Sequence, residues 1–169
     1  MTQRIFGITG WKNSGKTTLT EKLVRELTAR GHTVSTVKHA HHSFDIDKPD
    51  TDSFRHRAAG ASEVAIVGGE RWAIMHELRG ADEPSLEEVI ARLSPCDVVL
   101  VEGYKREGHA KLEARRLDAR DTQPMSRFDE TIVAIAADHR PENETVPVFG
   151  LDDASAIADF IELHVGLKK

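Results

Sequence analysis

Residues 10–18 read GWKNSGKTT, and this stretch decides the fold of the chain. The short apolar run 5–9 precedes it, and a segment with helical spacing follows it. From Gly10 to Thr17 every fixed position of the pattern G-x-x-x-x-G-K-[ST] is present, in the strand–loop–helix context that this pattern requires. The N–H groups of such a loop converge on phosphate oxygens, and the N-terminus of the helix adds a favourable dipole. The stretch therefore predicts a loop that binds the phosphates of a nucleotide.

Individual residues of this phosphate loop have distinct expected roles. Gly10 and Gly15 allow backbone angles and close approaches that a Cβ atom would obstruct. Lys16 is expected to reach the β- and γ-phosphates and to take a catalytic part, while the Thr17 hydroxyl is expected to ligate Mg²⁺. The predicted nucleotide-binding residues of the loop are Gly10, Trp11, Lys12, Asn13, Ser14, Gly15, Lys16, Thr17 and Thr18.

The composition limits the class of protein. A length of 169 residues is ordinary for one domain, so we predict a single nucleotide-binding domain over residues 1–169. The formal net charge is −5, and no basic footprint indicates a nucleic-acid partner. The N-terminus lacks the apolar core of a signal peptide, and no apolar stretch approaches the roughly 20 residues that a membrane span needs. Together with a single cysteine, Cys96, these features predict a cytoplasmic protein that does not contact a membrane.

Short apolar runs alternate with helical patterns along the chain, which is typical of a parallel sheet covered by helices on both faces. Strands are predicted at residues 4–9, 33–38, 64–67, 97–101, 131–136 and 146–149. One helical pattern ends before Gly31, a second follows Ser85, and a third follows Asp153. Residues 71–78 are expected to add an antiparallel hairpin strand, and the polar segment 103–127 is hard to assign. The predicted fold class is α/β, a mostly parallel P-loop NTPase fold.

The strand predicted at 97–101 is flanked by acids, because Asp97 opens it and Glu102 follows it. Ligands of open α/β sheets bind outside the carboxyl ends of the strands. At about 3.3 Å per residue, Asp97 lies roughly 16 Å from that edge. Glu102 is therefore the expected second magnesium ligand, directly or through water, with a solvated loop acid as the alternative.

The segment after the second predicted strand contains His39, His41 and His42, followed by Asp45 and Asp47. Histidines at this density suggest a transition-metal site, but no cysteine or second histidine cluster accompanies them. A switch-like loop explains the acids and their location together, with Asp45 or Asp47 near Mg²⁺ and the attacking water. We assign both acids a catalytic role, and a metal site or a merely polar loop are the alternatives.

The base of the nucleotide is expected to bind near the late strands. Residues 47–50 (DKPD) resemble the guanine-binding pattern [NT]-K-x-D only superficially, since they begin with aspartate and follow the second strand. Asp138 closes the apolar run 132–138 and is the candidate acceptor for N1 and N2 of guanine. A strand-end cap is the alternative role for this residue.

Four stretches together resemble the molybdopterin-guanine dinucleotide biosynthesis protein B (MobB) family. They are GWKNSGKTTL near the start, VKHAHHSFDIDKPDTDS at 37–53, RHRAAGA at 55–61 and VLVEGYK at 99–105. The phosphate loop alone is generic, whereas the run of histidines and acids and the segment around Glu102 are specific. The resemblance covers most of the chain up to about residue 111 and, more loosely, the rest.

The resemblance implies a function that spacing does not show. It implies a GTP-binding P-loop protein that uses Mg²⁺, hydrolyses GTP weakly and forms a homodimer. It also implies an accessory role beside the guanylyltransferase partner, the family's protein A, which attaches GMP to molybdopterin, with molybdopterin itself as a further ligand. Lys16, Thr17, Glu102, Asp45 and Asp47 match the family's site by position, while Lys12 and Asn13 stand where smaller loop residues are common.

Two other function classes are open alternatives. A small-molecule kinase would need a lid with several arginines, which Arg106, Arg115, Arg116 and Arg120 would supply. A metallochaperone-type GTPase would use the cluster of His39, His41 and His42.

Overall fold

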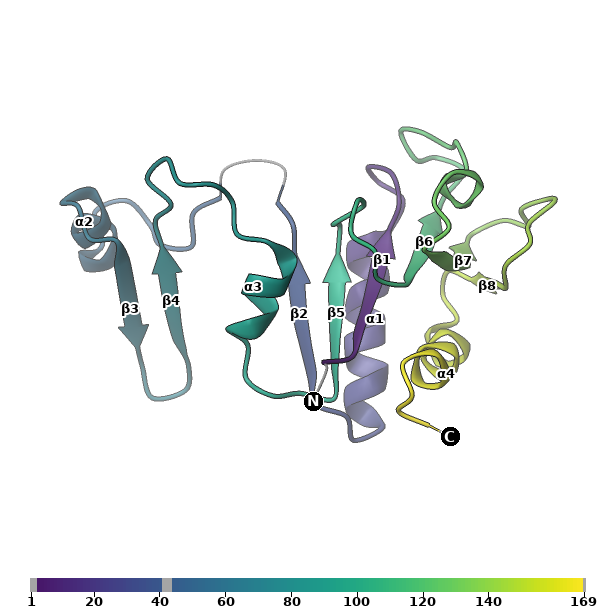
Figure 1. The fold of residues 1–169 in the computed structure, drawn as a ribbon, viewed down its shortest axis with the longest axis horizontal. Helices are drawn as coiled ribbons and strands as arrows, with labels where there is room; N and C mark the ends of the chain where they lie inside the picture. Colours follow the sequence, from purple (N-terminus) through teal and green to yellow (C-terminus); the bar gives the residue numbers. More distant parts are fainter. Residues whose placement is uncertain (1–2, 41–43, 169) are drawn as a thin grey trace. The chain divides into compact units, whose positions relative to one another are not determined.

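The structure is a computed structural model that describes residues 3–40 and 44–168 (Figure 1). The chain forms two compact units. The first comprises Met1–His39 and Leu86–Lys169, and the second comprises Ala40–Ser85. Our assignment of one domain to the whole chain stays a prediction. Among the described residues, no helix is both long enough and apolar enough to cross a membrane.

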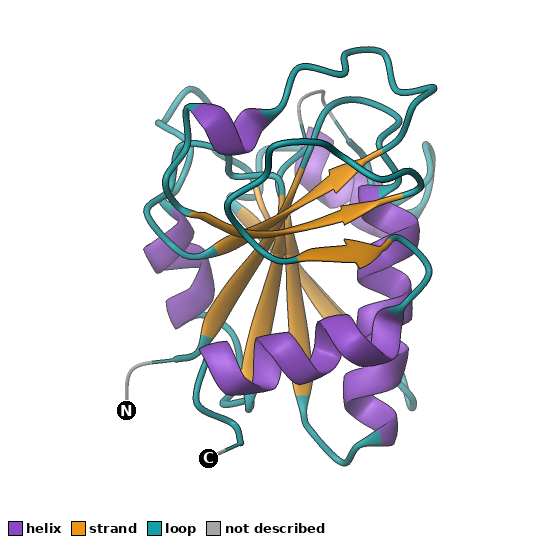
Figure 2. Ribbon diagram, turned by 90° about the vertical axis from the view of Figure 1, so that its right-hand side faces the viewer, coloured by secondary structure: helices purple, strands orange, loops and turns teal. Residues whose placement is uncertain are grey.

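The first unit is built on a six-stranded sheet in the order β2-β5-β1-β6-β7-β8, in which every pair of neighbours is parallel. Figure 2 shows the strands fanning out between layers of helices. The strands are β1 (Ile5–Thr9), β2 (Val34–Lys38), β5 (Val98–Glu102), β6 (Lys111–Arg115), β7 (Ile132–Ala137) and β8 (Val148–Gly150). The predicted α/β fold class is confirmed. Because β1 lies between β5 and β6, the residues that follow these three strands meet at one edge of the sheet.

Helices cover both faces of this sheet, as the alternation of buried residues along the strands requires. One face packs against α1 (Lys16–Ala29) and α4 (Ala154–His164), and the other packs against α3 (Leu86–Ala91). Within β5, Val98 and Leu100 face α1 and α4, whereas Val99 and Val101 face α3. Helix α1 ends two residues before Gly31, whose φ of +92° suits a helix C-terminus.

The second unit contains α2 (Asp52–Ala58) and an antiparallel hairpin of β3 (Glu63–Val67) and β4 (Trp72–His76). The hairpin is confirmed, and its turn is closed by a hydrogen bond from the Gly68 N–H to the carbonyl of Arg71. One expectation was wrong. The strand predicted at 64–67 does not join the parallel sheet, because it pairs with β4 in a two-stranded sheet of its own.

The polar segment 103–127, for which the sequence predicts no helix or strand, contains a central strand of the sheet. All five residues of β6 (KLEAR) are buried, and the strand lies between β1 and β7. A short 3₁₀ helix, Met125–Arg127, follows it. The remaining predicted strands of the parallel sheet are confirmed to within two residues at each end.

Candidate functional site

The phosphate loop connects β1 to α1, and its two glycines are required by its geometry. At Gly10 φ is +142°, and a Cβ atom would lie 2.4 Å from Ser14 Oγ and 2.5 Å from the carbonyl oxygen of Ala114. Gly15 has φ +90° and occupies the N-cap position of α1. The first N–H groups of α1 have no partner within the helix, so the loop presents backbone donors at its open end.

Lys16 lies in this loop among other cations. Its Nζ donates a hydrogen bond to the carbonyl oxygen of Trp11 at 2.7 Å. Burial lowers the pKa of Lys16, the nearby charges of Lys105 and Lys38 lower it further, and Glu102 opposes the shift. Lys105 also places its Nζ 4.3 Å from the centre of a Trp11 ring. A group of ammonium ions at one loop favours an anionic ligand.

The structure brings the two expected magnesium ligands together. The Thr17 hydroxyl donates to Glu102 Oε1 at 2.9 Å, and Glu102 is only 8% exposed. Lys38 Nζ lies 3.3 Å from the same carboxylate oxygen. Mg²⁺ prefers oxygen ligands such as one hydroxyl and one carboxylate, completed by phosphates and water. The side chains at this position therefore fit the ion.

Asp97 lies at the opposite end of β5, where it has a different role. Its Oδ2 accepts hydrogen bonds from the N–H and the hydroxyl of Thr33, each at 2.7 Å. These two hydrogen bonds lower the pKa of Asp97. The residue therefore ties the start of β5 to the start of β2.

Asp45 and Asp47 lie in the second unit and are both engaged by Arg57. The Arg57 guanidinium pairs with Asp47, with Asp45 Oδ1 at 3.1 Å and with Glu77 Oε1 at 2.7 Å. The hydrogen bond from Arg57 lowers the pKa of Asp47, and these carboxylates raise the pKa of Arg57. Arg57 therefore holds both acids in the second unit. The assigned catalytic roles of Asp45 and Asp47 stay predictions.

The histidine cluster is described only in part. His41 and His42 lie outside the described residues. The His39 ring lies 4.9 Å from the Tyr104 ring. Within residues 3–40 and 44–168, no group of three or more metal-binding side chains is present.

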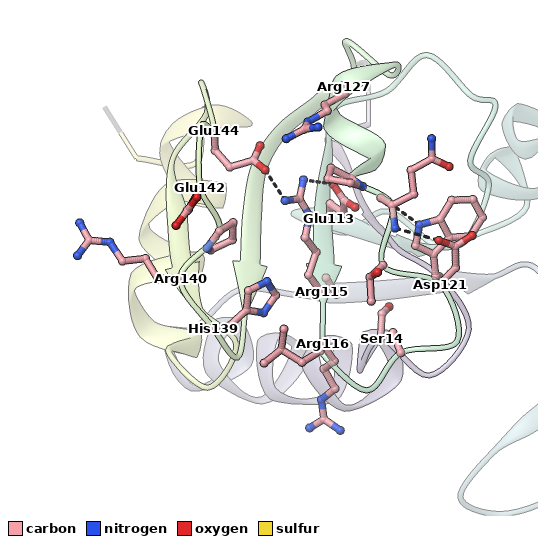
Figure 3. A pocket seen from close by; sticks show the side chains of 18 of the residues that line it. Ser14, Glu113, Arg115, Arg116, Asp121, Arg127, His139, Arg140, Glu142 and Glu144 are labelled. Atoms are coloured by element: carbon pink, nitrogen blue, oxygen red, sulfur yellow. Dashed lines mark hydrogen bonds and ion pairs between the residues drawn. The ribbon is translucent and has the colours of Figure 1, made fainter.

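A cavity of about 370 Å³ lies beside the phosphate loop in the first unit (Figure 3). Trp11 and Ser14 contribute to its lining from the phosphate loop. The end of β6 and the segments after β6 and β7 form the rest of the wall, including Arg116, Gln123 and His139. The wall and the loop are joined, since Trp11 Nε1 donates to the carbonyl of Gln123 at 2.7 Å and the Arg120 N–H donates to the carbonyl of Lys12 at 3.2 Å.

A buried ionic network fixes the shape of this cavity. Arg115 bonds to Glu113 on its own strand and to Glu144 on the far wall, as the dashed lines in Figure 3 show in part. Glu113 also accepts from the backbone N–H groups of Met125 and Ser126. Burial disfavours the charged form of Arg115, yet its carboxylate partners raise its pKa above the usual value. The network therefore attaches the segment that contains Met125 and Ser126, and the segment that contains Glu144, to strand β6.

Within the described part of the chain, three buried polar atoms of cavity-lining residues have no hydrogen-bond partner, namely Ser14 Oγ, Arg115 Nε and Arg116 Nε. Buried polar atoms are rarely left without a partner, so a ligand with acceptor atoms fits here. Of these atoms, Arg116 Nε lies 3.3 Å from the position that a Cβ atom on Gly15 would take.

Asp138, the candidate for guanine recognition, directly precedes His139, which lines this cavity. Its Oδ1 accepts from the N–H of Leu117 at 3.2 Å and contacts His139 Nδ1 at 2.9 Å. Leu117 and His139 both line the cavity. The contact with His139 and the hydrogen bond from Leu117 lower the pKa of Asp138. In this structure Asp138 therefore holds together two residues of the cavity wall, and its role toward guanine stays a prediction.

Comparison with known proteins identifies the family. A family model described as "Molybdopterin guanine dinucleotide synthesis protein B" matches residues 5–138. The matched residues include the phosphate loop, Glu102 and Asp138. The chain belongs to this family.

Relatives of the MobB family span almost the whole chain. The molybdopterin-guanine dinucleotide biosynthesis adapter protein of Haemophilus influenzae is 40% identical over 161 residues, which cover 94% of this chain and 87% of that protein. The adapter protein of Escherichia coli is 36% identical over 159 residues, which cover 93% and 90%. These names give no support to the kinase or metallochaperone alternatives.

Solved MobB structures share the fold. A MobB protein homolog from Bacillus stearothermophilus superimposes with a TM-score of 0.74 at 27% identity, covering 98% of this chain and all of that one. A second structure, molybdopterin-guanine biosynthesis protein B, gives a TM-score of 0.72 at 24% identity and covers 95% and 99%. At that identity the second likeness concerns the fold alone.

Sequence reasoning did not single out Lys38 or Lys105 as site residues. Lys38 is the last residue of β2 and is paired in register with Glu102, so its position at the site follows from the strand order. Knowing that β2 neighbours β5 would have predicted it. Lys105 follows Glu102 by three residues, and only the backbone turn at Gly103 and Tyr104, both with positive φ, brings it to Trp11.

Proposed function

We propose that this MobB protein binds GTP with Mg²⁺ and serves as an accessory protein in molybdenum cofactor biosynthesis. In this role it assists a molybdopterin guanylyltransferase, protein A of the same pathway, in attaching GMP to molybdopterin. The observation that carries the proposal is the contact of Thr17 with Glu102 at the open end of a phosphate loop. The relatives named adapter proteins of molybdopterin-guanine dinucleotide biosynthesis support the pathway.

The phosphates of the nucleotide would be held by residues 10–18. The N-terminal N–H groups of α1 and the ammonium of Lys16 face the same loop, and an arriving phosphate would replace the carbonyl of Trp11 as the acceptor for Lys16. Thr17 and Glu102 would hold Mg²⁺. When bound, the ion neutralises charge on the phosphate oxygens.

The nucleoside would enter the cavity beside the loop. The cavity volume of about 370 Å³ falls within the range typical of small-ligand sites. Arg115 Nε donates and Ser14 Oγ donates or accepts, so both suit the acceptor atoms of a purine or a ribose. We propose that Asp138 supports guanine selection through Leu117 and His139, whose positions it fixes.

Hydrolysis of GTP by the protein alone is expected to be slow. An arginine that neutralises the transition-state charge is worth about 10³–10⁵ in rate, and residues 10–18 include none. Asp45 and Asp47, which we propose to orient water, are engaged by Arg57. Turnover well below the roughly 10 s⁻¹ median of enzymes is therefore expected.

The accessory role calls for assembly with other molecules. We propose a cytoplasmic homodimer that meets the transferase, with molybdopterin as a ligand of the complex. An exposed apolar face of the hairpin supports a protein partner, since Val67, Trp72 and Ile74 are 79%, 67% and 54% exposed. Sedimentation of the purified protein measures the oligomeric state directly.

A competition experiment tests the function. The purified protein is titrated with labelled GTP in the presence of Mg²⁺ while unlabelled ATP competes, and turnover is measured with and without the transferase. We expect GTP to bind more tightly than ATP and the transferase to change turnover. Preference for ATP, with turnover that rises only on adding a small phosphate acceptor, would replace this proposal by the kinase alternative.

A further inference from the structure

Lys38 occupies an unexpected position for a lysine at the magnesium site. It ends β2, the first strand in the order of the sheet, and pairs in register with Glu102. Its Nζ lies 3.3 Å from Glu102 Oε1 and 3.5 Å from Thr17 Oγ1. The same two oxygens are 2.9 Å apart. One ammonium ion therefore contacts both side chains that fit Mg²⁺.

We propose that Lys38 takes the place of the metal ion until a nucleotide arrives, and thereby makes metal binding depend on the nucleotide. The inference rests on the proposed function and adds an order of binding to it. Glu102 is buried, and a buried carboxylate needs a positive partner. Lys38 supplies that charge in the nucleotide-free protein.

The ammonium and the metal ion exclude one another at this position. Mg²⁺ takes its oxygen ligands at about 2.0–2.1 Å, so an ion bound to Thr17 and Glu102 would lie within a few ångströms of the present Nζ position. Two cations at that separation repel strongly. Free Mg²⁺ must therefore displace Lys38 before it binds Glu102.

A bound triphosphate makes the replacement of Lys38 by the metal ion more favourable. It adds negative charge beside Lys16 and Thr17, which favours the divalent ion and offers Lys38 a new partner. The Lys38 side chain is 59% exposed, and its flexible four-carbon stem allows Nζ to leave Glu102 without moving the strand. The metal and the nucleotide consequently bind together rather than independently.

The other nearby lysines are held by different groups. Lys16 Nζ donates to the carbonyl of Trp11, and Lys105 lies over the Trp11 ring. Within the described part of the chain, the ion pair of Glu102 is made by Lys38. Removing Lys38 should therefore leave Glu102 available to a metal ion.

Manganese binding to the nucleotide-free protein tests this proposal. Free Mn²⁺, used as the probe for Mg²⁺, is counted by electron paramagnetic resonance in titrations of wild type and Lys38→Met. We expect the variant to bind Mn²⁺ about tenfold more tightly than wild type, which is about 1.4 kcal/mol. With saturating GTP the two affinities should agree within about threefold.

Two further variants make the result specific. The gain should disappear in the double variant Lys38→Met/Glu102→Gln, because the released carboxylate is then missing. The matched control is Lys22→Met, which also removes a lysine of an ion pair, here with Asp152 on the surface, and should leave Mn²⁺ affinity unchanged. Circular dichroism verifies that each variant is folded.

The outcomes separate this inference from the proposed function. Equal or weaker Mn²⁺ binding by folded Lys38→Met would overturn the role of Lys38, even if GTP binds normally. Failure of wild type to bind GTP in the same titrations would overturn the proposed function and this inference with it.

Discussion

Glu102 and Glu113 are two buried glutamates on the strands that flank β1, and they are held in opposite ways. Glu102, at the end of β5, is 8% exposed, and in the described part of the chain its carboxylate is bound by two side chains, through the hydroxyl of Thr17 and the ammonium of Lys38. Glu113, in β6, is 1% exposed and accepts from two backbone N–H groups and from Arg115.

The difference separates a carboxylate that builds the fold from one that is suited to a ligand. Backbone N–H groups cannot leave Glu113 without moving the chain at Met125 and Ser126. Side chains can leave Glu102 by rotation about their own single bonds, without any movement of the backbone. Burial alone therefore does not identify a functional acid, whereas the kind of partner does.

The largest effect is expected from removing the structural glutamate. Glu113→Ala leaves Arg115 buried without one of its carboxylates and two N–H groups without acceptors. Breaking a buried pair in this way costs about 3–5 kcal/mol. Urea denaturation followed by circular dichroism measures the change, and a loss below about 1 kcal/mol would erase the contrast between the two glutamates.

Removing the other glutamate should affect metal dependence instead. Glu102→Gln keeps the size of the side chain and a hydrogen bond with Thr17, so the free energy of unfolding should change by less than about 1 kcal/mol. The strengthening of GTP binding by Mg²⁺ should fall by about tenfold or more. Isothermal titration with and without Mg²⁺ measures it.

Asp97→Asn is the control, since Asp97 lies at the other end of β5. It weakens the hydrogen bonds from Thr33 and should reduce stability by about 1 kcal/mol without changing the Mg²⁺ dependence. A loss of Mg²⁺ dependence in Asp97→Asn, with none in Glu102→Gln, would refute the assignment of the metal ligand.

The smallest effect concerns pH and the network around Glu113. Burial raises the pKa of Glu144, but hydrogen bonds from Arg115 and Ser126 outweigh it, so the pKa lies below the ordinary value of 4.5. A carboxyl with a depressed pKa stabilises the fold above its unfolded pKa, and this contribution is lost as the pH falls through the folded value. Unfolding free energies measured at about pH 6 and about pH 3 should therefore fall less in Glu144→Gln than in wild type. An equal fall in both proteins would show that the charge of Glu144 does not contribute to the stability of the network.

The same two strands show what the sequence could predict. The run VVLVE of β5 is apolar, so its place in the core and the position of Glu102 at its end followed from hydrophobicity and strand direction. The run KLEAR of β6 carries three charges and was not recognised as a strand, although all five residues are buried. Its Leu112 and Ala114 alternate with Lys111, Glu113 and Arg115, which is the one local sign of a strand.

The missed contacts depend on partners that are distant in sequence. Lys111, fully buried, donates to Thr131 and pairs with Asp129, and Arg115 pairs with Glu144. No spacing rule relates these residues, because the pairs form only once β6 and β7 are adjacent. The phosphate loop, in contrast, is a contiguous motif and was placed from the sequence. The cavity beside it was not foreseen, since much of its wall comes from the unassigned segment 103–127.

Binding of GTP to wild type and to Lys16→Ala is the most direct test of the account, because every other role depends on phosphates in the loop. Removing the ammonium that we propose to face the β- and γ-phosphates should weaken binding by about tenfold or more, which is about 1.4 kcal/mol, in a variant that remains folded. Unchanged GTP affinity in folded Lys16→Ala would contradict a nucleotide site in this loop.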